Sequence, residues 1–244
     1  MAALIAQKTQ HPKAATPTNA LLEQFHDPLD CLTAHLMLES AEVLAEVKPA
    51  NLISLVNRTR PCGRNLYLLW QQLGDQLESR LSTLQITILQ NKGTALLLLC
   101  SNRTSLDRHL AHKGIRVLLR KAGYKPEAGT DALLSELQQR IANKGTFPHE
   151  IGLFIGYPAK DVAAFMGLVK LPFTCQGPWK IYGNPGQSLS LADQFRHQRQ
   201  LMGARLSDCA TLGPCLETLN RNSQHLFLSQ IDKSIHYQTK REVT

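Results

Sequence analysis

The residues whose types are best suited to chemistry lie at the start of one apolar run. His149 and Glu150 follow Pro148 and directly precede the run 151–157. A histidine in this position can act as a general base or bind a metal ion through its neutral imidazole. It can equally hydrogen-bond backbone carbonyls, because no second ligand follows at the spacing of a metal site. We take His149 as the candidate ligand-binding residue and metal ligand, while the missing second ligand favours the alternative of a structural role.

A second set of residues has the chain order of a papain-like hydrolase. Ser40 comes first, His149 precedes the apolar run, and Asn184 follows Trp179. In such enzymes a base takes the proton of the nucleophile and a third group orients the base. The hydroxyl of Ser40 is much less acidic than a thiol. The order therefore indicates the relic of a hydrolase or transferase, as an alternative to ligand binding.

Positive charge is concentrated between residues 103 and 125. The stretch contains one acid, Asp107. Its cations are Arg103, Arg108, Lys113, Arg116, Arg120, Lys121 and Lys125. Such a stretch can bind phosphate or nucleic acid. No aromatic residue occurs in it before Tyr124, so the stacking surface of single-strand binders is missing. A solvent-exposed helix face is the preferred interpretation, and nucleic acid is not an expected partner.

Composition predicts a globular protein of about one domain. The chain has 244 residues, of which 43% are hydrophobic and 19% charged, enough to bury a sizeable core. Its longest uninterrupted apolar run, 95–100, is far shorter than the roughly 20 residues of a membrane helix. The N-terminal run 2–6 is too short for a signal peptide, so we expect a cytoplasmic protein. The six cysteines form no Cys-x-x-Cys pair, and we expect them to be small buried apolar residues.

Hydrophobic periodicity predicts an α/β (α+β) fold, in which several amphipathic helices cover a small mixed or antiparallel sheet. The expected helices are 20–47 with a break at Pro28, 66–81, two between 104 and 123, 130–141, 160–168 and 189–206. The expected strands are 84–89 and 95–100, which form an antiparallel hairpin, and the short strands 151–157 and 179–182. We expect residues 1–19 to be a flexible tail, 20–206 a single domain, and 207–244 a helical and polar extension.

Three stretches of the chain resemble the motifs of a known family. Residues 147–158 read F-P-H-E-I-G-L-F-I-G-Y-P, residues 177–184 read G-P-W-K-I-Y-G-N, and the weaker stretch 43–52 reads V-L-A-E-V-K-P-A-N-L. In this order they resemble the bacterial domain-of-unknown-function family DUF3793. The chain departs from the family pattern at Ser40, where a cysteine is expected, at Pro178, which replaces an aromatic residue, and at Asn184, which replaces an acid.

The resemblance implies an accessory role, because family members resemble proteins found beside iron-uptake genes and flavodoxins. We therefore expect a protein linked to iron or haem handling that binds a small ligand or a partner, such as an iron- or haem-handling protein or a flavodoxin. Haem or iron is the cofactor that this role implies. The motifs specify no reaction. The expected ligand-binding residues are His149, Glu150, Tyr157, Trp179 and Lys180.

Overall fold

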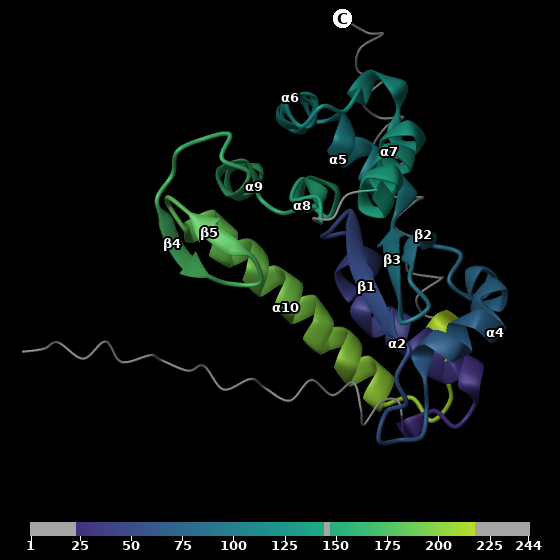
Figure 1. The fold of residues 1–244 in the computed structure, drawn as a ribbon. Helices are drawn as coiled ribbons and strands as arrows, with labels where there is room; N and C mark the ends of the chain where they lie inside the picture. Colours follow the sequence, from purple (N-terminus) through teal and green to yellow (C-terminus); the bar gives the residue numbers. More distant parts are fainter. Residues whose placement is uncertain (1–22, 144–146, 218–244) are drawn as a thin grey trace, which may run out of the picture.

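A three-stranded antiparallel sheet forms the centre of the computed structural model, which describes residues 23–143 and 147–217 (Figure 1). Its strands are β1 (Ala50–Val56), β2 (Gln85–Asn91) and β3 (Ala95–Ser101), in the order β1-β3-β2. The predicted β2–β3 hairpin is confirmed, and its turn contains Gly93 with a φ of +74°. The structure adds β1, which periodicity does not predict. This strand pairs with β3 along its whole length, from Ala50 opposite Ser101 to Val56 opposite Ala95.

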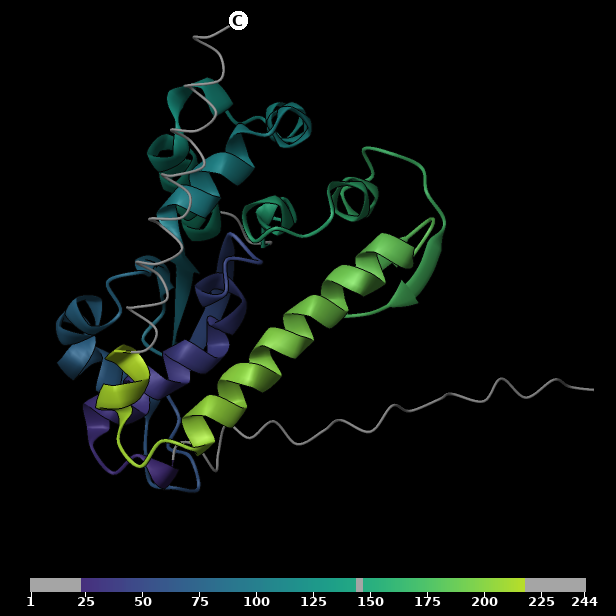
Figure 2. The ribbon, with the colours of Figure 1, turned by 180° about the vertical axis from the view of Figure 1, so that it is seen from behind.

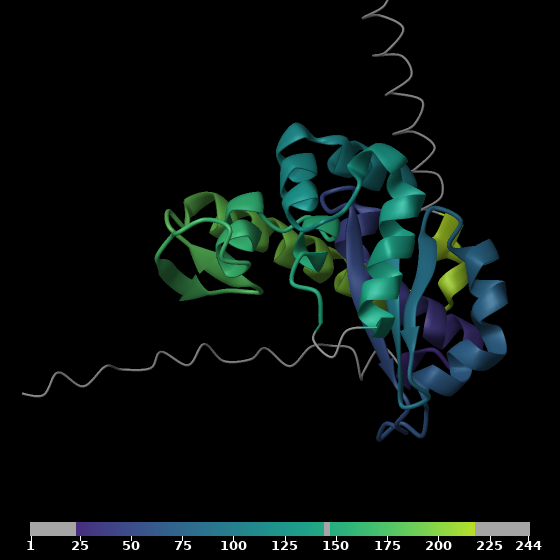
Figure 3. The same ribbon diagram turned by 45° about the horizontal axis from the view of Figure 1, so that its top comes forward.

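The middle strand, β3, is apolar on both faces of the sheet. Leu96 and Leu98 belong to one hydrophobic core, whereas Leu97 and Leu99 belong to the other, because successive side chains of a strand alternate. The first core is covered by α2 (Pro28–Glu39), α3 (Ala41–Leu44) and α4 (Leu66–Arg80). The second core is covered by α5 (Arg103–Ala111), α6 (Lys113–Lys121) and α7 (Thr130–Asn143), as Figure 3 shows.

A long helix, α10 (Gly186–Ser207), crosses the molecule diagonally (Figures 1 and 2). Its first half packs on a hairpin of β4 (Phe173–Gln176) and β5 (Lys180–Tyr182), and its last turns pack on α2. A small third core, of Trp179, Ile181, Ala192 and Phe195, holds the hairpin on the helix. The short helices α8 (Ile151–Phe154) and α9 (Ala159–Phe165) lie between this hairpin and the sheet.

The predicted buried strand at 151–157 is wrong. These residues form α8 and then a tight turn, in which the N–H of Tyr157 donates to the carbonyl of Gly152 at 2.9 Å. Gly156 makes this turn with a φ of +77°, and a Cβ there would lie 2.5 Å from Cδ of Pro49. A short run of apolar residues is equally consistent with a buried strand and a buried helix. In this protein the run forms a short helix that is followed by the turn at Gly156.

Most of the other predicted elements are confirmed within a few residues. The expected helix 20–47 is divided, because α2 ends at Ser40 and α3 begins after it. No helix in the described ranges is long and apolar enough to cross a membrane. The predicted tail, 1–19, and the part of the predicted extension beyond residue 217 lie outside the described residues.

The cysteines follow the prediction only in part. Cys31 and Cys100 are buried in the first core, as expected. Cys62 and Cys175 are partly exposed. Cys209 and Cys215 correct the prediction, because they form a disulfide in the segment that follows α10. The short stretch after the helix brings their Cα atoms to 6.7 Å, within the range that a disulfide bridges.

Candidate ligand-binding pocket

A cavity of about 310 Å³ lies between the β4–β5 hairpin and the segment 147–158, which we call the hallmark segment. Five aromatic side chains and one lysine are part of its lining: Phe147, His149, Tyr157, Phe165, Trp179 and Lys180. The volume is at the lower end of the range of sites for small organic molecules, about 300–1,000 Å³. Four of the five residues that the sequence predicts to bind a ligand therefore meet in one cavity. The fifth, Glu150, does not line it.

The carboxylate of Asp161 holds the wall of this pocket together. It is 1% exposed and accepts four hydrogen bonds. Its donors are the indole Nε1 of Trp179 (2.9 Å), the hydroxyl of Ser188 (2.6 Å), the backbone N–H of Tyr182 (2.9 Å) and Nζ of Lys160 (2.7 Å). These donors come from β5 and the residue before it, from α10 and from the first turn of α9, so one carboxylate joins three elements.

The pKa of Asp161 reflects these contacts. Burial would raise the pKa of the carboxyl, but the hydrogen bonds from Lys160, Ser188 and the other donors outweigh burial and lower it. The carboxylate is thus fully ionised at neutral pH and has its lone pairs occupied by the protein. We assign Asp161 a structural role, which fixes the indole of Trp179 as a wall of the pocket.

Aromatic rings continue from this wall into the protein. The rings of Tyr157 and Trp179 lie 4.5 Å apart with an interplanar angle of 30°, and Phe195 meets Trp179 edge-on at 6.1 Å. Behind them lies Lys48, whose ammonium is 5.3 Å from the centroid of Tyr157 and 5.0 Å from that of Phe195. Cation–π contacts of this kind stabilise a buried ammonium. Lys48 belongs to the weaker motif, 43–52, and Trp179 to the motif 177–184, so all three motifs meet at Tyr157.

Lys48 and Glu42 form a buried pair only in the sense that the charge of each affects the pKa of the other. Both side chains are 5% exposed, and Nζ of Lys48 donates to Oδ1 of Asn51 at 2.8 Å. Burial lowers the pKa of Lys48 to about 8, although the charge of Glu42 opposes this, and burial raises the pKa of Glu42. Among the described residues Oε2 of Glu42 has no hydrogen-bond partner. Tyr157 shares this environment, because burial and the charge of Glu42 raise its pKa.

The mouth of the pocket is formed around Phe165, a residue that the sequence does not single out. His149 meets its ring edge-on at 4.7 Å, and the ammonium of Lys180 lies 5.3 Å from its centroid. The rings of Phe147 and Phe165 are 48% and 41% exposed, so large apolar surfaces at the entrance remain uncovered. Uncovered aromatic surface around a cavity is typical of a binding site.

Glu150 points away from the pocket. It is 7% exposed and accepts hydrogen bonds from the hydroxyl of Tyr124 (3.2 Å) and from the guanidinium of Arg140 (3.0 Å). These contacts fasten the hallmark segment to α7 and to the loop after α6. His149 and Glu150 thus face different sides. The structure gives Glu150 a structural environment within the second core.

The three residues of the papain-like order have different surroundings. Ser40 is fully buried at the junction of α2 and α3, where its hydroxyl lies beside the thiol of Cys100. Asn184 is exposed, and its Oδ1 accepts from the N–H of Gly186 at the start of α10. Of the three, only His149 lines the pocket. The hydrolase alternative therefore still rests on the order of the residues alone, and the geometry adds no support for it.

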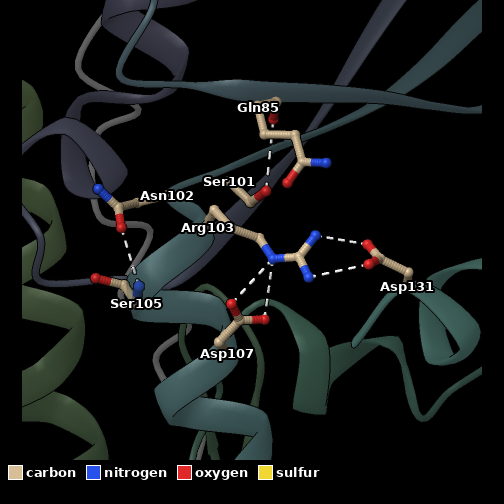
Figure 4. A network of polar contacts seen from close by, with 7 residues as sticks. All are labelled: Gln85, Ser101, Asn102, Arg103, Ser105, Asp107 and Asp131. Carbon is tan, nitrogen blue, oxygen red and sulfur yellow. Dashed lines mark hydrogen bonds and ion pairs between the residues drawn. The ribbon is translucent and has the colours of Figure 1, made fainter. Parts of the chain in front are cut away.

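Several cations of the basic stretch are paired with acids. Arg103 binds both carboxylate oxygens of Asp131, at 2.5 and 3.0 Å, and both oxygens of Asp107, as Figure 4 shows. Arg116 and Arg120 both bind Glu127. These pairs join α5 to α7 and fasten α6 to the residues after it. They leave less unpaired positive charge on this surface than the sequence indicates.

Potential metal ligands do not gather in the part of the chain that the structure describes. No group of three or more His, Cys, Asp or Glu side chains comes together there in a way that could hold a metal ion. His149 would therefore have to bind a metal that arrives with most of its other ligands, as haem iron does. Its place at the mouth of the pocket is compatible with that type of ligation.

Fold and pocket together define a mixed α+β protein with a ligand-sized cavity between its hallmark segment and a helix-bound hairpin. The chain belongs to the family described as protein of unknown function (DUF3793), whose model matches residues 36–213. That range contains the sheet, every lining residue of the pocket and all of α10. The resemblance drawn from the three motifs is thereby confirmed. No curated protein and no solved structure matches the chain.

Proposed function

We propose that this protein is a small-ligand-binding accessory protein and that the pocket of the hallmark segment is its binding site. The carrying observation is that Tyr157, Trp179 and Lys180, from two separate family motifs, line one cavity together with His149. A carboxylate that is saturated with hydrogen bonds holds the wall of this cavity in place. Rigid aromatic walls with a few polar groups are the usual composition of a small-molecule site.

A connection with iron or haem handling remains part of this proposal and comes from the family resemblance. His149 supplies an imidazole at the mouth of the pocket, and imidazole is a common ligand of haem iron. The volume of the cavity suits a molecule of one or two rings better than a whole porphyrin. If haem binds this protein, His149 is the residue that would hold its iron.

Titration of the purified protein with haemin and with ferrous iron tests this part, with absorbance spectra as the readout. We expect a spectral change that saturates and that His149→Ala abolishes. The matched control is His197→Ala, because His197 is an exposed histidine of α10 that does not line the pocket. Equal spectra for wild type and both variants would contradict the iron and haem proposal.

The same experiment separates a structural role of His149 from a ligand role. If the imidazole only satisfied backbone groups, its removal would lower the free energy of unfolding by about 1–3 kcal/mol and leave binding unchanged. The structure shows a ring contact with Phe165 and an exposed side chain. We therefore expect His149→Ala to change binding and to leave the melting temperature nearly unchanged.

A further inference from the structure

The mouth of the pocket carries the charge of Lys180 without a matching acid. Lys180 and His149 both lie against the ring of Phe165. Among the residues that the structure describes, neither forms an ion pair with a carboxylate. Lys180 is exposed and comes from β5, one residue after Trp179. A cation that sits on an aromatic ring at a cavity entrance, without an acid of its own, favours an anionic ligand group.

The acid in the pocket wall does not cancel this charge. Asp161 lines the cavity, but each of its oxygens accepts two hydrogen bonds from the protein. One of the donors is the ammonium of Lys160, which forms an ion pair with it. The charge of Asp161 is therefore offset within the wall, and its lone pairs are not offered to a ligand. A cationic ligand would find no available acceptor on this carboxylate.

The aromatic walls of the pocket favour a ligand with a flat ring system. Trp179 and Tyr157 present stacked rings, and Phe165 and Phe147 leave uncovered aromatic surface at the entrance. Aromatic rings gain from stacked and edge-on contacts beyond the apolar area that they bury. A flat ring system that enters between these side chains would place a substituent at the mouth, beside Lys180.

We propose that the ligand of this pocket is a small aromatic carboxylate of one or two rings. This inference rests on the proposed function and adds the chemical class of the ligand. The ring packs against Trp179, Tyr157 and Phe165, and the carboxylate meets the ammonium of Lys180 at the entrance. His149, which also contacts Phe165 and lines the pocket, can supply a second donor.

Calorimetric titration with three compounds of one shape tests the charge preference. The compounds are naphthalene-2-carboxylate, naphthalene-2-methanol and naphthalene-2-methylamine, which carry a negative, a neutral and a positive substituent. We expect the carboxylate to bind about threefold to tenfold more tightly than the alcohol, as for a partly exposed ion pair, and the amine to bind most weakly.

Two lysine variants test whether Lys180 causes the preference for the carboxylate. Lys180→Gln should lower the affinity for the carboxylate to that for the alcohol. Lys170→Gln, which removes an exposed lysine that does not line the pocket, should keep the preference of the wild type. If the alcohol and the amine bind as tightly as the carboxylate, the ligand class is overturned while the pocket remains a binding site. If none of the three compounds binds, the ligand class is overturned, and the titration with haemin and ferrous iron decides the proposed function separately.

Discussion

Two buried acids lie on either side of the same aromatic cluster, and the protein treats them differently. Asp161 accepts four hydrogen bonds, and its pKa is lowered. Glu42 is also buried, but its pKa is raised, and its Oε2 lacks a partner among the described residues. Trp179 connects to the first and Tyr157 to the second. The comparison shows that burial alone does not set the direction in which the pKa of an acid moves, because hydrogen-bond donors can outweigh burial.

The difference implies different energetic roles. An ionised carboxylate that has its donors arranged around it is costly to replace, because every donor then loses its partner. A buried pair with incomplete hydrogen bonding, such as Glu42 and Lys48, is weak evidence for stability, since desolvation offsets the attraction of the charges. We therefore expect the Asp161 site to hold the pocket together and the Glu42–Lys48 pair to add little stability.

The largest expected effect is that of Asp161→Asn. The amide replaces one acceptor by a donor that faces the hydroxyl and N–H donors around it. We expect the free energy of unfolding to fall by about 3–5 kcal/mol, the usual cost of breaking a buried charged network. Chemical denaturation provides the measurement. Asp193→Asn is the control, because Asp193 is an exposed acid of α10 that pairs with Arg196, and it should unfold as the wild type does.

Gly156→Ala tests the junction between the hallmark segment and the residues next to Lys48. The new Cβ would meet the ring of Pro49 at 2.5 Å, and the left-handed φ of +77° adds strain. We expect a loss of about 2–4 kcal/mol, of which roughly 1–2 kcal/mol comes from the backbone conformation. Gly167→Ala separates the two causes, because Gly167 has a φ of +75° but nothing within 4 Å of the new Cβ. Equal losses in the two variants would show that the contact with Pro49 is unimportant.

The pH dependence of stability tests the Glu42–Lys48 pair. The pKa of Lys48 is about 8 in the folded protein and about 10.5 in the unfolded chain. Between these values the unfolded chain binds more protons, so the free energy of unfolding rises with pH. We expect wild type to gain about 2 kcal/mol relative to the double variant Glu42→Gln/Lys48→Met between pH 8 and 10.5. The charged neighbours Arg199 and Glu39 are retained in both proteins.

The same double variant gives the smallest expected effect at pH 7. Replacing a buried pair by neutral side chains of similar size is often neutral or stabilising. We expect the free energy of unfolding to change by less than about 1 kcal/mol in the destabilising direction, or to increase. A loss comparable to that of Asp161→Asn would remove the contrast between the two buried acids.

The sequence predicts the elements whose periodicity is long. The β2–β3 hairpin and the helices α4, α7 and α10 follow from apolar spacing and from the turn at Gly93. It does not predict β1, because this strand follows a proline and its apolar and polar residues do not alternate regularly. The burial of its side chains depends on its pairing with β3. The run 151–157 is too short for its period to distinguish a strand from a helix.

The candidate site was partly predictable. His149, Tyr157, Trp179 and Lys180 were identified through the family motifs and do line one pocket. The roles of Asp161 and Phe165 depend on contacts between α9 and β5, which lie far enough apart in the chain to have no local signal. Asp161 does follow the hallmark segment closely, and a buried acid after a family motif is a signal that could have indicated it.

The indole N–H signals of the ¹⁵N-labelled protein test the central claim, that the pocket of the hallmark segment binds a small aromatic ligand. The chain has two tryptophans. Trp179 lines the pocket, whereas Trp70 lies on α4 in the first core and serves as an internal reference. With naphthalene-2-carboxylate added in steps, we predict that the Trp179 signal moves and saturates while the Trp70 signal stays in place. A stationary Trp179 signal, or equal movement of both signals, would contradict the account.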